Sequence, residues 1–481
     1  MKIRRNKKVS ENEVQEPAGY ISVGLDIGTT KVVAFVGKRR ENSDKVEILG
    51  QGETISVGVQ RGQVINIAKT VTAINHAIKH ACASSHLVLD EVMVGIAGQH
   101  ISSFHSKQEI KRKFPDDLVT AEDVKQLIDE VFRVNVRPGN QIIDAIPQEF
   151  YVDDNRDLVD PVGVVGTQLG SEFNIITGSE QHIRNVVRCV QQCDLNMNGL
   201  ILEPLASAAV VLDEREKESG VALVDIGGGT TDLAIFYNGI LRHTAVIPIG
   251  GDVITDDIKS IFQGIVKEDA ERVKKEYGSC FSDKSKDVIL AIQGIKGRPA
   301  VEIPKSKLAE VIIARMDDII ERIMEEIGKS GYANRLGCGI VLTGGGSLLD
   351  GIGTYTGFKT GMSVRIGLPE EGIVFDDDAP QKYKSPIYST ALGLMLIGVQ
   401  RNDSQVDADP VAEPTPKPNG KRRAEPKPDP VGTDDGLNDD GGGRNGFIDH
   451  IWKKCMELIG SLITPPDEGD DVDFDENEDY R

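Results

Sequence analysis

Long apolar runs are absent from this chain. No stretch of its 481 residues approaches the ~20 apolar residues that a membrane-spanning helix needs. The first ten residues, MKIRRNKKVS, are basic, but no apolar segment follows them as it would in a secretion signal. We therefore expect a protein that is made and kept in the cytosol.

Cysteines are few, and basic residues are outnumbered. Six cysteines scattered over this length do not form a disulfide framework. Cys189 and Cys193 can lie one helical turn apart, but two thiolates without a second pair or a nearby histidine are a poor zinc site, so reduced core cysteines are preferred. The 55 basic and 76 acidic residues give a formal net charge of -21, and such a surface repels phosphodiester backbones. We expect no nucleic-acid partner.

Up to about residue 400 the sequence alternates regularly. Short Val/Ile-rich runs are followed by longer amphipathic stretches, which is the pattern of strands and helices in α/β domains. Residues 401–445 break this pattern, because they are rich in Pro, Gly, Asp and Lys and contain almost nothing apolar. Such a segment cannot offset the entropy lost on ordering, so we interpret it as a disordered tether.

An apolar stripe follows the tether, in residues 446–463. Its apolar side chains recur at steps of three and four and indicate an amphipathic helix, which Pro465 and Pro466 end. Residues 464–481 form an acidic tail that we expect to be disordered. The helix has two candidate partners, a membrane interface and a groove on another protein, and we prefer the membrane. The anchoring side chains would then be Phe447, Ile448, Ile451, Trp452, Leu458, Ile459 and Leu462.

An internal repeat lies within the regular part of the chain. Residues 24–37 read GLDIGTTKVVAFVG, and residues 223–239 read LVDIGGGTTDLAIFYNG. Each copy is an apolar strand that ends in Asp, a Gly/Thr turn, and a second apolar strand closed by Gly, which predicts a β-hairpin with a tip of small residues. Two such copies indicate a duplicated domain.

The hairpin tips are suited to binding a polyphosphate. A Gly/Thr turn presents backbone N–H groups and hydroxyls without bulky side chains, so phosphates can approach closely. The preceding aspartates, Asp26 and Asp225, offer hard oxygen ligands, direct or through water, for the Mg²⁺ that accompanies ATP. Asp232 is either a water-mediated metal contact or a polar residue at a strand edge. The tip residues are Gly28, Thr29, Thr30 and Lys31 in the first copy, and Gly227, Gly228, Gly229 and Thr230 in the second.

Three further motifs accompany the hairpins. Glu203 precedes Pro204 at the predicted start of an Ala-rich helix, where it either favours the helix N-terminus or activates a water molecule for attack on the γ-phosphate. In AERVKK, spacing alone favours a solvated ion-pair face. In LTGGGS, a glycine turn after a strand can pass closely under a base or ribose. The residues concerned are Glu271, Lys274 and Lys275 in the first of these motifs, and Gly344, Gly345, Gly346 and Ser347 in the second.

Taken in order, DIGTTK, EPLASAA, DIGGGTTD, AERVKK and LTGGGS resemble the five motifs of the actin, heat-shock chaperone and sugar kinase superfamily. Within it, residues of about 20–400 and the terminal helix resemble the FtsA family of bacterial cell-division proteins. This resemblance implies actin-like (ribonuclease H-like) duplicated α/β domains with an inserted subdomain. It also implies a catalytic role for Glu203 with Asp225, metal binding by Asp26 and Asp225, and adenosine contacts from the AERVKK and LTGGGS motifs.

The resemblance gives an expected division of the chain. GIAGQHI, AIPQEFYVDD and DPVGVVG lie where the family carries its inserted subdomain. The expected parts are an N-terminal disordered segment 1–18, a first domain formed by 19–89 and 171–219, an insert 90–170, a second domain 220–400, the tether 401–445, the anchoring helix 446–463 and the acidic tail 464–481.

The implied function is that of an ATP- and Mg²⁺-binding protein that polymerises on the cytoplasmic face of the cell membrane at midcell. There the family anchors FtsZ through the FtsZ C-terminal tail and works with other divisome proteins in septum assembly. Whether the chain is an enzyme stays open between a weak ATPase and a nucleotide-gated scaffold. The alternatives are a small-molecule kinase, for which we find no acceptor-activating carboxylate, and a pilus-assembly ATPase of the same fold.

Overall fold

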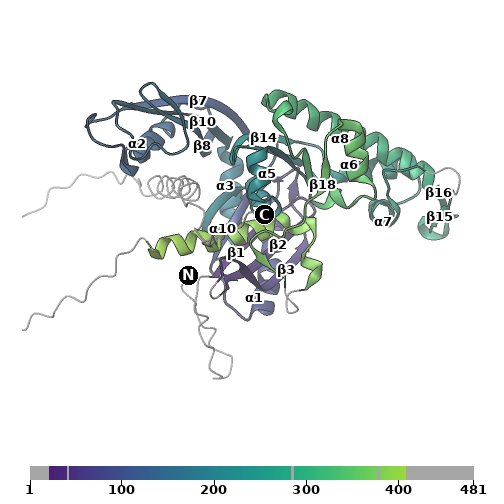
Figure 1. Cartoon of the computed structure of the whole chain (residues 1–481). Coiled ribbons are helices and arrows are strands. Elements are labelled where there is room, and N and C mark those ends of the chain that lie inside the picture. The colour runs from purple at the N-terminus through teal and green to yellow at the C-terminus, as the bar shows by residue number, and fades with distance from the viewer. Residues whose placement is uncertain (1–20, 41–42, 283–286, 376–379, 408–481) are drawn as a thin grey trace, which may run out of the picture. The chain divides into compact units, whose positions relative to one another are not determined.

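The computed structural model describes residues 21–40, 43–282, 287–375 and 380–407 (Figure 1). The expected anchoring helix 446–463 lies outside the described residues, as do the N-terminal segment, the acidic tail and the tether from residue 408 on. Among the residues that the structure describes, no helix is both long and apolar enough to cross a membrane.

The chain divides into two compact units. Within the described residues, the larger unit comprises everything up to 106, then 134–148 and 173–407, and the smaller unit comprises 107–133 and 149–172.

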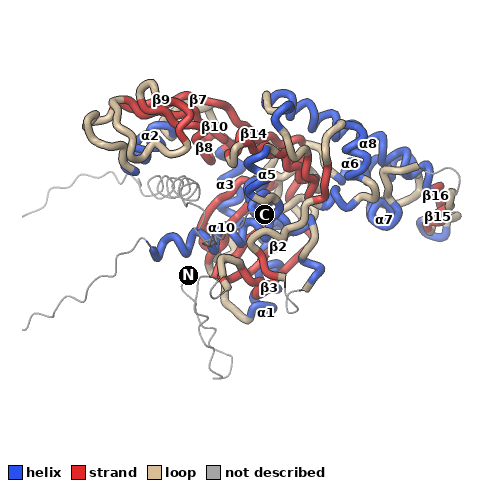
Figure 2. The backbone as a smooth tube through the Cα atoms, in the orientation of Figure 1, coloured by secondary structure: helices blue, strands red, loops and turns tan. Residues whose placement is uncertain are grey.

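The described part of the larger unit contains a six-stranded sheet in the order β11-β6-β1-β2-β3-β19. Two of its strands, β2 and β3, are labelled in Figure 2. β1 and β2 form an antiparallel hairpin that β3 extends, whereas β6 runs parallel to β1 and β11 runs parallel to β6. β6 lies within the range 90–170 expected for the insert, yet it is a strand of this main sheet. The strands are β1 (Ile21–Ile27), β2 (Lys31–Arg39), β3 (Val46–Ile55), β6 (Glu91–Ile96), β11 (Asn196–Leu202) and β19 (Ile373–Val374).

Helices cover both faces of this sheet. Ala34 and Gly52 are cross-strand partners on one face, where a side chain on Gly52 would overlap the backbone of α1. Gly24 and Phe35 are partners on the other face, where a side chain on Gly24 would overlap the backbone of α10. Neighbouring residues of a strand point to opposite faces, so α1 and α10 lie on opposite sides of the sheet. The helices are α1 (Ile67–Ser85), α3 (Glu180–Gln191), α4 (Glu203–Val211) and α10 (Ser389–Asp407), whereas α5 (Glu214–Ser219) contacts β13 of the second sheet.

The position of α10 was not foreseen. It begins inside the range 220–400 expected for the second domain, but it packs against β1, β2 and α4 of the first (Figure 1). It also continues to Asp407, beyond the expected start of the tether at residue 401. The chain therefore returns to the first sheet after it has formed the second.

A second, five-stranded sheet in the described part of the larger unit has the order β14-β13-β12-β17-β18. β12 and β13 form the second hairpin of the repeat, and β17 and β18 continue the sheet in parallel. The strands are β12 (Val221–Ile226), β13 (Thr231–Tyr237), β14 (Ile240–Ile247), β17 (Ile340–Thr343) and β18 (Val364–Ile366).

The helices of this second half bury apolar stripes against its core. α8 places Leu308, Ile312, Ile319, Ile323 and Ile327 at helical steps, and all five are buried. The helices are α6 (Gly251–Ile261), α7 (Lys267–Tyr277), α8 (Lys305–Ser330) and α9 (Ile352–Thr360), and two small hairpins are β4 (Val59–Gln60) with β5 (Gln63–Val64) and β15 (Ile289–Ile292) with β16 (Val301–Pro304). Short 3-10 turns are η2 (Ile295–Gly297), η3 (Ala333–Arg335), η4 (Gly345–Leu348), η5 (Gln381–Tyr383) and η6 (Pro386–Tyr388).

The smaller unit is built around a buried arginine. The guanidinium group of Arg112 donates to the carbonyl oxygens of Asp117 at 2.9 Å, Gly166 at 2.7 Å and Leu118 at 2.7 Å, and it also contacts the Asp123 carboxylate at 3.2 Å. Asp123 closes a capping box at the start of α2. The elements are α2 (Ala121–Val131) and the sheet β7-β10-β8-β9, with β7 (Ser102–Lys111), β8 (Asn140–Val152), β9 (Asn155–Leu158) and β10 (Gln168–Ser179), of which β7, β8 and β10 begin or end in the larger unit.

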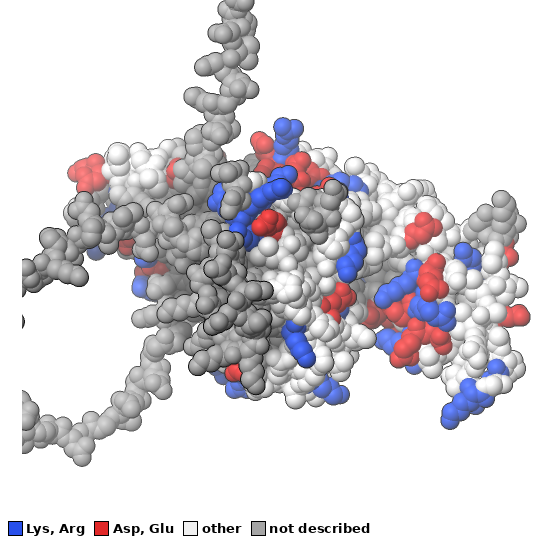
Figure 3. All heavy atoms as spheres, turned by 90° about the horizontal axis from the view of Figure 1, so that it is seen from below, with Lys and Arg blue, Asp and Glu red and all other residues white. Residues whose placement is uncertain are grey.

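Charges of both signs occur together on the surface. On the face shown in Figure 3, acidic and basic side chains lie in mixed groups. Ion pairs of this kind are formed by Arg315 with Asp257 at 2.7 Å and by Lys267 with Asp256 at 3.0 Å. Exposed pairs contribute little to stability, so the fold depends mainly on its apolar cores.

Candidate functional site

Four carboxylates converge at the ends of strands in the larger unit. Asp26 lies at the carboxyl end of β1, and Glu203 directly follows the carboxyl end of β11. In the sheet, β6 lies between β1 and β11 and runs parallel to both. Asp225 is the residue before the last of β12, and Asp232 is its direct cross-strand partner on β13. In sheets of this kind, ligands bind outside the carboxyl ends of parallel strands.

Burial and mutual repulsion make these four groups difficult to ionise. Burial raises the pKa of Asp26 to about 6 and that of Asp232 to about 8, and in both cases the carboxylate of Asp225 adds to the rise. Burial, with the other three carboxylates, raises the pKa of Glu203 well above its ordinary value. Acidic side chains so perturbed mark a candidate functional site, because a bound cation would relieve the repulsion.

Two hydroxyl groups position Asp225. Ser207 of α4 donates to its Oδ2 at 2.8 Å, and Thr390 of α10 approaches the same oxygen at 3.4 Å. Burial raises the pKa of Asp225, and these hydrogen bonds oppose the rise. Sequence reasoning missed both residues, although Ser207 lies inside the EPLASAA motif. Thr390 is 183 positions from Ser207, and no local pattern connects them.

The carboxylates retain oxygen atoms for a ligand. Asp232 accepts from Thr230 at 3.0 Å through Oδ2, but its Oδ1 is buried without a hydrogen-bond partner in the described structure. A buried, unpartnered carboxylate oxygen is what a hydrated cation would satisfy. Among the described residues, no group of three or more His, Cys, Asp or Glu side chains is arranged to hold a metal ion directly.

The two hairpin tips lie against each other. A side chain on Gly228 would overlap Thr30, and one on Gly229 would come within 2.7 Å of the hydroxyl of Thr29. The register supports the repeat, since Ile27 pairs with Val32 in the first hairpin as Ile226 pairs with Thr231 in the second. The structure thus brings together the tip residues that the sequence singled out, from Gly28 to Thr30 and from Gly227 to Thr230.

Lys31 is held to one side of the tips. Its ammonium group donates to the carbonyl oxygen of Ile387 at 2.6 Å and lies 4.0 Å from the centre of the Tyr388 ring. Burial lowers the pKa of Lys31, while the carboxylates of Asp26 and Glu53 oppose that shift. Lys31 is close enough to Asp26 to interact with it, but its hydrogen bond goes to a carbonyl oxygen.

The AERVKK motif on α7 lies beside the second tip. Glu271 pairs with Lys274 at 2.6 Å and with the largely exposed Lys275 at 3.2 Å, so the ion-pair face expected from the spacing is present. Lys274 is nevertheless buried, and it donates to the carbonyl oxygen of Gly251 at 2.9 Å. Gly251 donates in turn to the carbonyl oxygen of Gly227 at 2.9 Å, which connects α7 to the tip.

The LTGGGS turn passes directly beside Asp225. Gly344 has φ 79°, and a side chain there would overlap a carboxylate oxygen of Asp225. A side chain on Gly345 would meet nothing closer than Ile387 at 3.8 Å, so this face of the turn is open. Ser347 donates to the carbonyl oxygen of Gly344 at 2.7 Å and closes the turn in η4.

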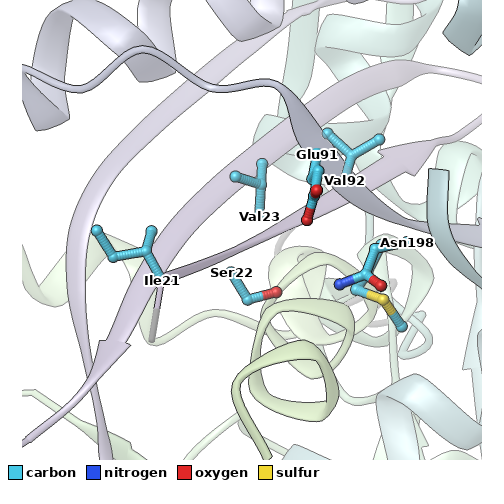
Figure 4. A pocket seen from close by; sticks show the side chains of 7 residues that line it. Ile21, Ser22, Val23, Glu91, Val92 and Asn198 are labelled. Carbon is cyan, nitrogen blue, oxygen red and sulfur yellow. The ribbon is translucent and has the colours of Figure 1, made fainter. Parts of the chain in front are cut away.

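A shallow recess lies at the opposite ends of the strands. It is lined by Ile21, Ser22 and Val23 of β1, Glu91, Val92 and Met93 of β6, and Asn198 (Figure 4). These are the amino ends of β1 and β6, whereas the four carboxylates lie at or beyond the carboxyl ends. It is too small to admit a ligand.

Comparisons with known proteins agree with this architecture. Residues 222–393 match the family model "Cell division protein FtsA", and residues 98–177 match "SHS2 domain inserted in FTSA". A cell division protein FtsA from Neisseria meningitidis is 37% identical over 385 residues, which cover 79% of this chain and 91% of the relative. The corresponding protein of Escherichia coli is 35% identical over 384 residues, 78% of this chain and 90% of the relative.

Solved structures confirm the expected actin-like α/β fold. One chain of a PilM-PilN type IV pilus biogenesis complex has a TM-score of 0.58 at 16% identity, covering 79% of this chain and 98% of its own length. MreB5 of Spiroplasma citri bound to ADP has a TM-score of 0.50 at 14% identity, with 82% and 100% covered. At such identities these likenesses concern the fold alone.

Proposed function

The chain belongs to the FtsA family of cell division proteins, and on that premise we propose that it is an actin-like protein whose assembly depends on bound Mg-ATP. The observation that carries the proposal is the convergence of four buried carboxylates on two apposed Gly/Thr tips. Membership of the family supports a role in cell division. We further propose that the chain polymerises at the cytoplasmic face of the cell membrane, anchors FtsZ there and associates with other divisome proteins.

The tips would hold the phosphates. Backbone N–H groups of Gly28 and Gly228 and hydroxyl groups of Thr29 and Thr230 suit phosphate oxygens, because no bulky side chain separates them from a ligand. Mg²⁺, when bound, would neutralise the phosphate charge next to Asp26 and Asp225. Glu271, Lys274, Lys275 and the glycines from Gly344 would then contact adenosine. In support, MreB5 of Spiroplasma citri holds ADP on the same fold.

Glu203 is the candidate water activator. Burial and the three neighbouring carboxylates raise the pKa of Glu203 well above its ordinary value, so its ionised form is disfavoured. A base must be ionised, so activation of water requires additional positive charge in the site. This dependence suits a weak ATPase that acts mainly as a nucleotide-gated scaffold. We expect Glu203→Gln to leave Mg-ATP affinity unchanged and to slow single-turnover hydrolysis; equal turnover in both proteins would remove Glu203 as water activator.

Calorimetry tests the nucleotide site. The full chain is titrated with Mg-ATP, and then with ATP in the presence of a chelator. We expect binding that weakens when Mg²⁺ is withdrawn, because the carboxylates and the phosphates then repel each other. Failure of the chain to bind Mg-ATP would contradict the proposal.

Two separate measurements test the membrane and FtsZ parts. Trp452 and Phe447 belong to the apolar stripe outside the described residues, and changing both to Glu should abolish pelleting with anionic liposomes. Undiminished pelleting would reject membrane insertion and favour a protein groove. A pull-down with the C-terminal tail of FtsZ should retain the chain, and a negative result would favour the kinase or pilus alternatives. The FtsA-specific insert already favours the cell-division role over both.

A further inference from the structure

A tight turn with a left-handed arginine lies beside both hairpin tips. β4 and β5 pair through Gln60 and Gln63, so Arg61 and Gly62 alone form the loop between them. Their φ values are 49° and 72°. A two-residue hairpin loop with both φ values positive prefers Asn-Gly, and arginine in the first position costs about 1 kcal/mol or more. An unfavourable backbone conformation next to a candidate site points to a functional residue.

The turn contacts the first tip and the second. The N–H group of Gly62 donates to the hydroxyl of Thr29 at 3.1 Å. A side chain on Gly229 would lie 3.0 Å from the backbone nitrogen of Arg61 and 2.9 Å from its Cα. Arg61 is therefore fixed at the point where the two tips meet.

The contacts at the two ends of the second tip indicate how a nucleotide would lie along it. Its beginning, Gly227, is bonded to Gly251, which accepts from Lys274 of the expected adenosine motif. Its far side, Gly229, borders Arg61. A nucleotide whose base lies near Lys274 and whose phosphates follow the tip would have its terminal phosphate nearest to Arg61.

The charges around the two tips leave a place for a cation beside the terminal phosphate. Four carboxylates lie at the site, and the lysines described beside the tips have other partners. Lys31 donates to the carbonyl oxygen of Ile387, and Lys274 pairs with Glu271. Within the described part of the chain, the exposed guanidinium group of Arg61 forms no hydrogen bond or ion pair. A planar guanidinium group binds phosphate oxygens in a two-pronged manner.

We propose that Arg61 recognises the terminal phosphate of a bound nucleoside triphosphate and so distinguishes ATP from ADP. This inference rests on the proposed nucleotide function. It makes Arg61 a specificity-determining residue, and it explains why a turn that asparagine would form at lower cost contains an arginine. The γ-phosphate would connect β4–β5 to both tips, whereas a diphosphate would leave Arg61 unengaged.

The test compares ATP with ADP in variants that preserve the turn. Arg61→Asn keeps a residue that tolerates the left-handed conformation but removes the guanidinium group. Arg61→Lys keeps the positive charge but loses the planar, two-pronged shape of the guanidinium group. Binding of ADP and of a non-hydrolysable β,γ-imido ATP analogue is measured by calorimetry with Mg²⁺. For Arg61→Asn we expect about tenfold weaker binding of the analogue or more, and a change of less than about twofold for ADP. Arg61→Lys should lie between the wild type and Arg61→Asn.

The chain offers a matched control. Lys296 and Gly297 also have positive φ values, of 49° and 76°, but they lie in η2 between β15 and β16 and not at the tips. Lys296→Asn should leave the affinities for both nucleotides unchanged. Equal losses for ADP and the analogue in Arg61→Asn, or no loss for either, would overturn the role of Arg61. If the wild type bound neither nucleotide, the nucleotide function itself would fail, and the inference with it.

Discussion

The two hairpins of the repeat have the same backbone plan and different partners. In the first, Asp26 lies across from Val33, whereas in the second Asp225 lies across from Asp232. Lys31 lowers the pKa of both aspartates, and Asp225 raises that of Asp26. The two hairpins therefore differ in the cross-strand partner of the aspartate, which is apolar for Asp26 and another carboxylate for Asp225.

The second hairpin is also better supported. Ser207 and Thr390, from two different helices, hydrogen-bond Asp225, and Gly344 passes directly beside it. Among the described residues, the side chain of Asp26 has no equivalent hydrogen bond. The two copies therefore have similar strand–turn–strand backbones, and the surrounding helices hold the carboxylate of the second copy more rigidly. The predictions below test this asymmetry.

The largest expected difference concerns the two aspartates themselves. Asp225→Ala removes a carboxylate and leaves two hydroxyls without their acceptor, so we expect Mg-ATP affinity to fall about 100-fold or more. Asp26→Ala removes a carboxylate with fewer partners, and we expect a loss of about tenfold. Calorimetry measures both, with Asp317→Ala on α8 as a control, because that carboxylate is bonded to Tyr355. A larger loss for Asp26→Ala would reverse the ranking.

The next prediction concerns Asp232, which has no counterpart in the first hairpin. Its pKa in the fold is about 8, against an ordinary value of 3.8. Between these values the folded protein keeps a proton that the unfolded chain has released, so the free energy of unfolding falls as pH rises through this window. Asp232→Asn is neutral throughout, and without nucleotide or Mg²⁺ it should be more stable than the wild type by at least about 1 kcal/mol at pH 8.

Denaturant unfolding of both proteins at pH 5, 6.5 and 8 measures this effect. The advantage of Asp232→Asn should grow with pH and be smallest at pH 5. An advantage that is constant with pH would mean that Asp232 does not carry the proton. The same substitution should weaken Mg-ATP binding, so its effects on stability and on function would have opposite signs.

A smaller effect is expected from the two hydroxyls. Ser207→Ala removes the donor at 2.8 Å from Asp225, and we expect Mg-ATP affinity to fall about tenfold. Thr390→Val removes the group at 3.4 Å, and we expect a loss below about threefold. Because the two hydroxyls are 3.0 Å apart and form one network, the double variant should lose less than the product of the single effects. Equal losses from both single variants would show that Asp225 is not oriented mainly from α4.

The local parts of this site were predictable from the sequence, and the long-range parts were not. The hairpins were found because each carries its own strand pattern and turn residues, and a strand followed by a Gly/Thr turn has few other ways to fold. Glu203 was found because it stands next to Pro204 at a helix start. Each of these signals lies within at most 17 consecutive residues.

The partners of Asp225 depend on where distant segments meet. Thr390 reaches the site because α10 returns to the first sheet, and that return depends on glycines, such as Gly24, that let helix and strand backbones approach closely. A single glycine in a strand does not indicate which helix will pack against it. The raised pKa values of Glu203 and Asp232 could not be predicted from the sequence either, because they result from burial and from charges at separate strand ends.

The smallest predicted effect separates two accounts of Lys31. Its ammonium group is 2.6 Å from the carbonyl oxygen of Ile387 and lies over the ring of Tyr388, which itself donates to Glu53 at 2.8 Å. If this arrangement persists when nucleotide binds, Lys31→Met should lower Mg-ATP affinity by less than about threefold, the size of a screened, indirect charge effect.

Lys38→Met, near the other end of β2, is the matched control, since it removes the same charge from the same strand. A tenfold or greater loss in Lys31→Met, with none in Lys38→Met, would mean that the ammonium group leaves Ile387 for the phosphates. The first hairpin would then contribute the main cationic contact and the second the main carboxylate. The two copies would differ in the sign of the charge that they bring to the ligand, rather than in rigidity alone.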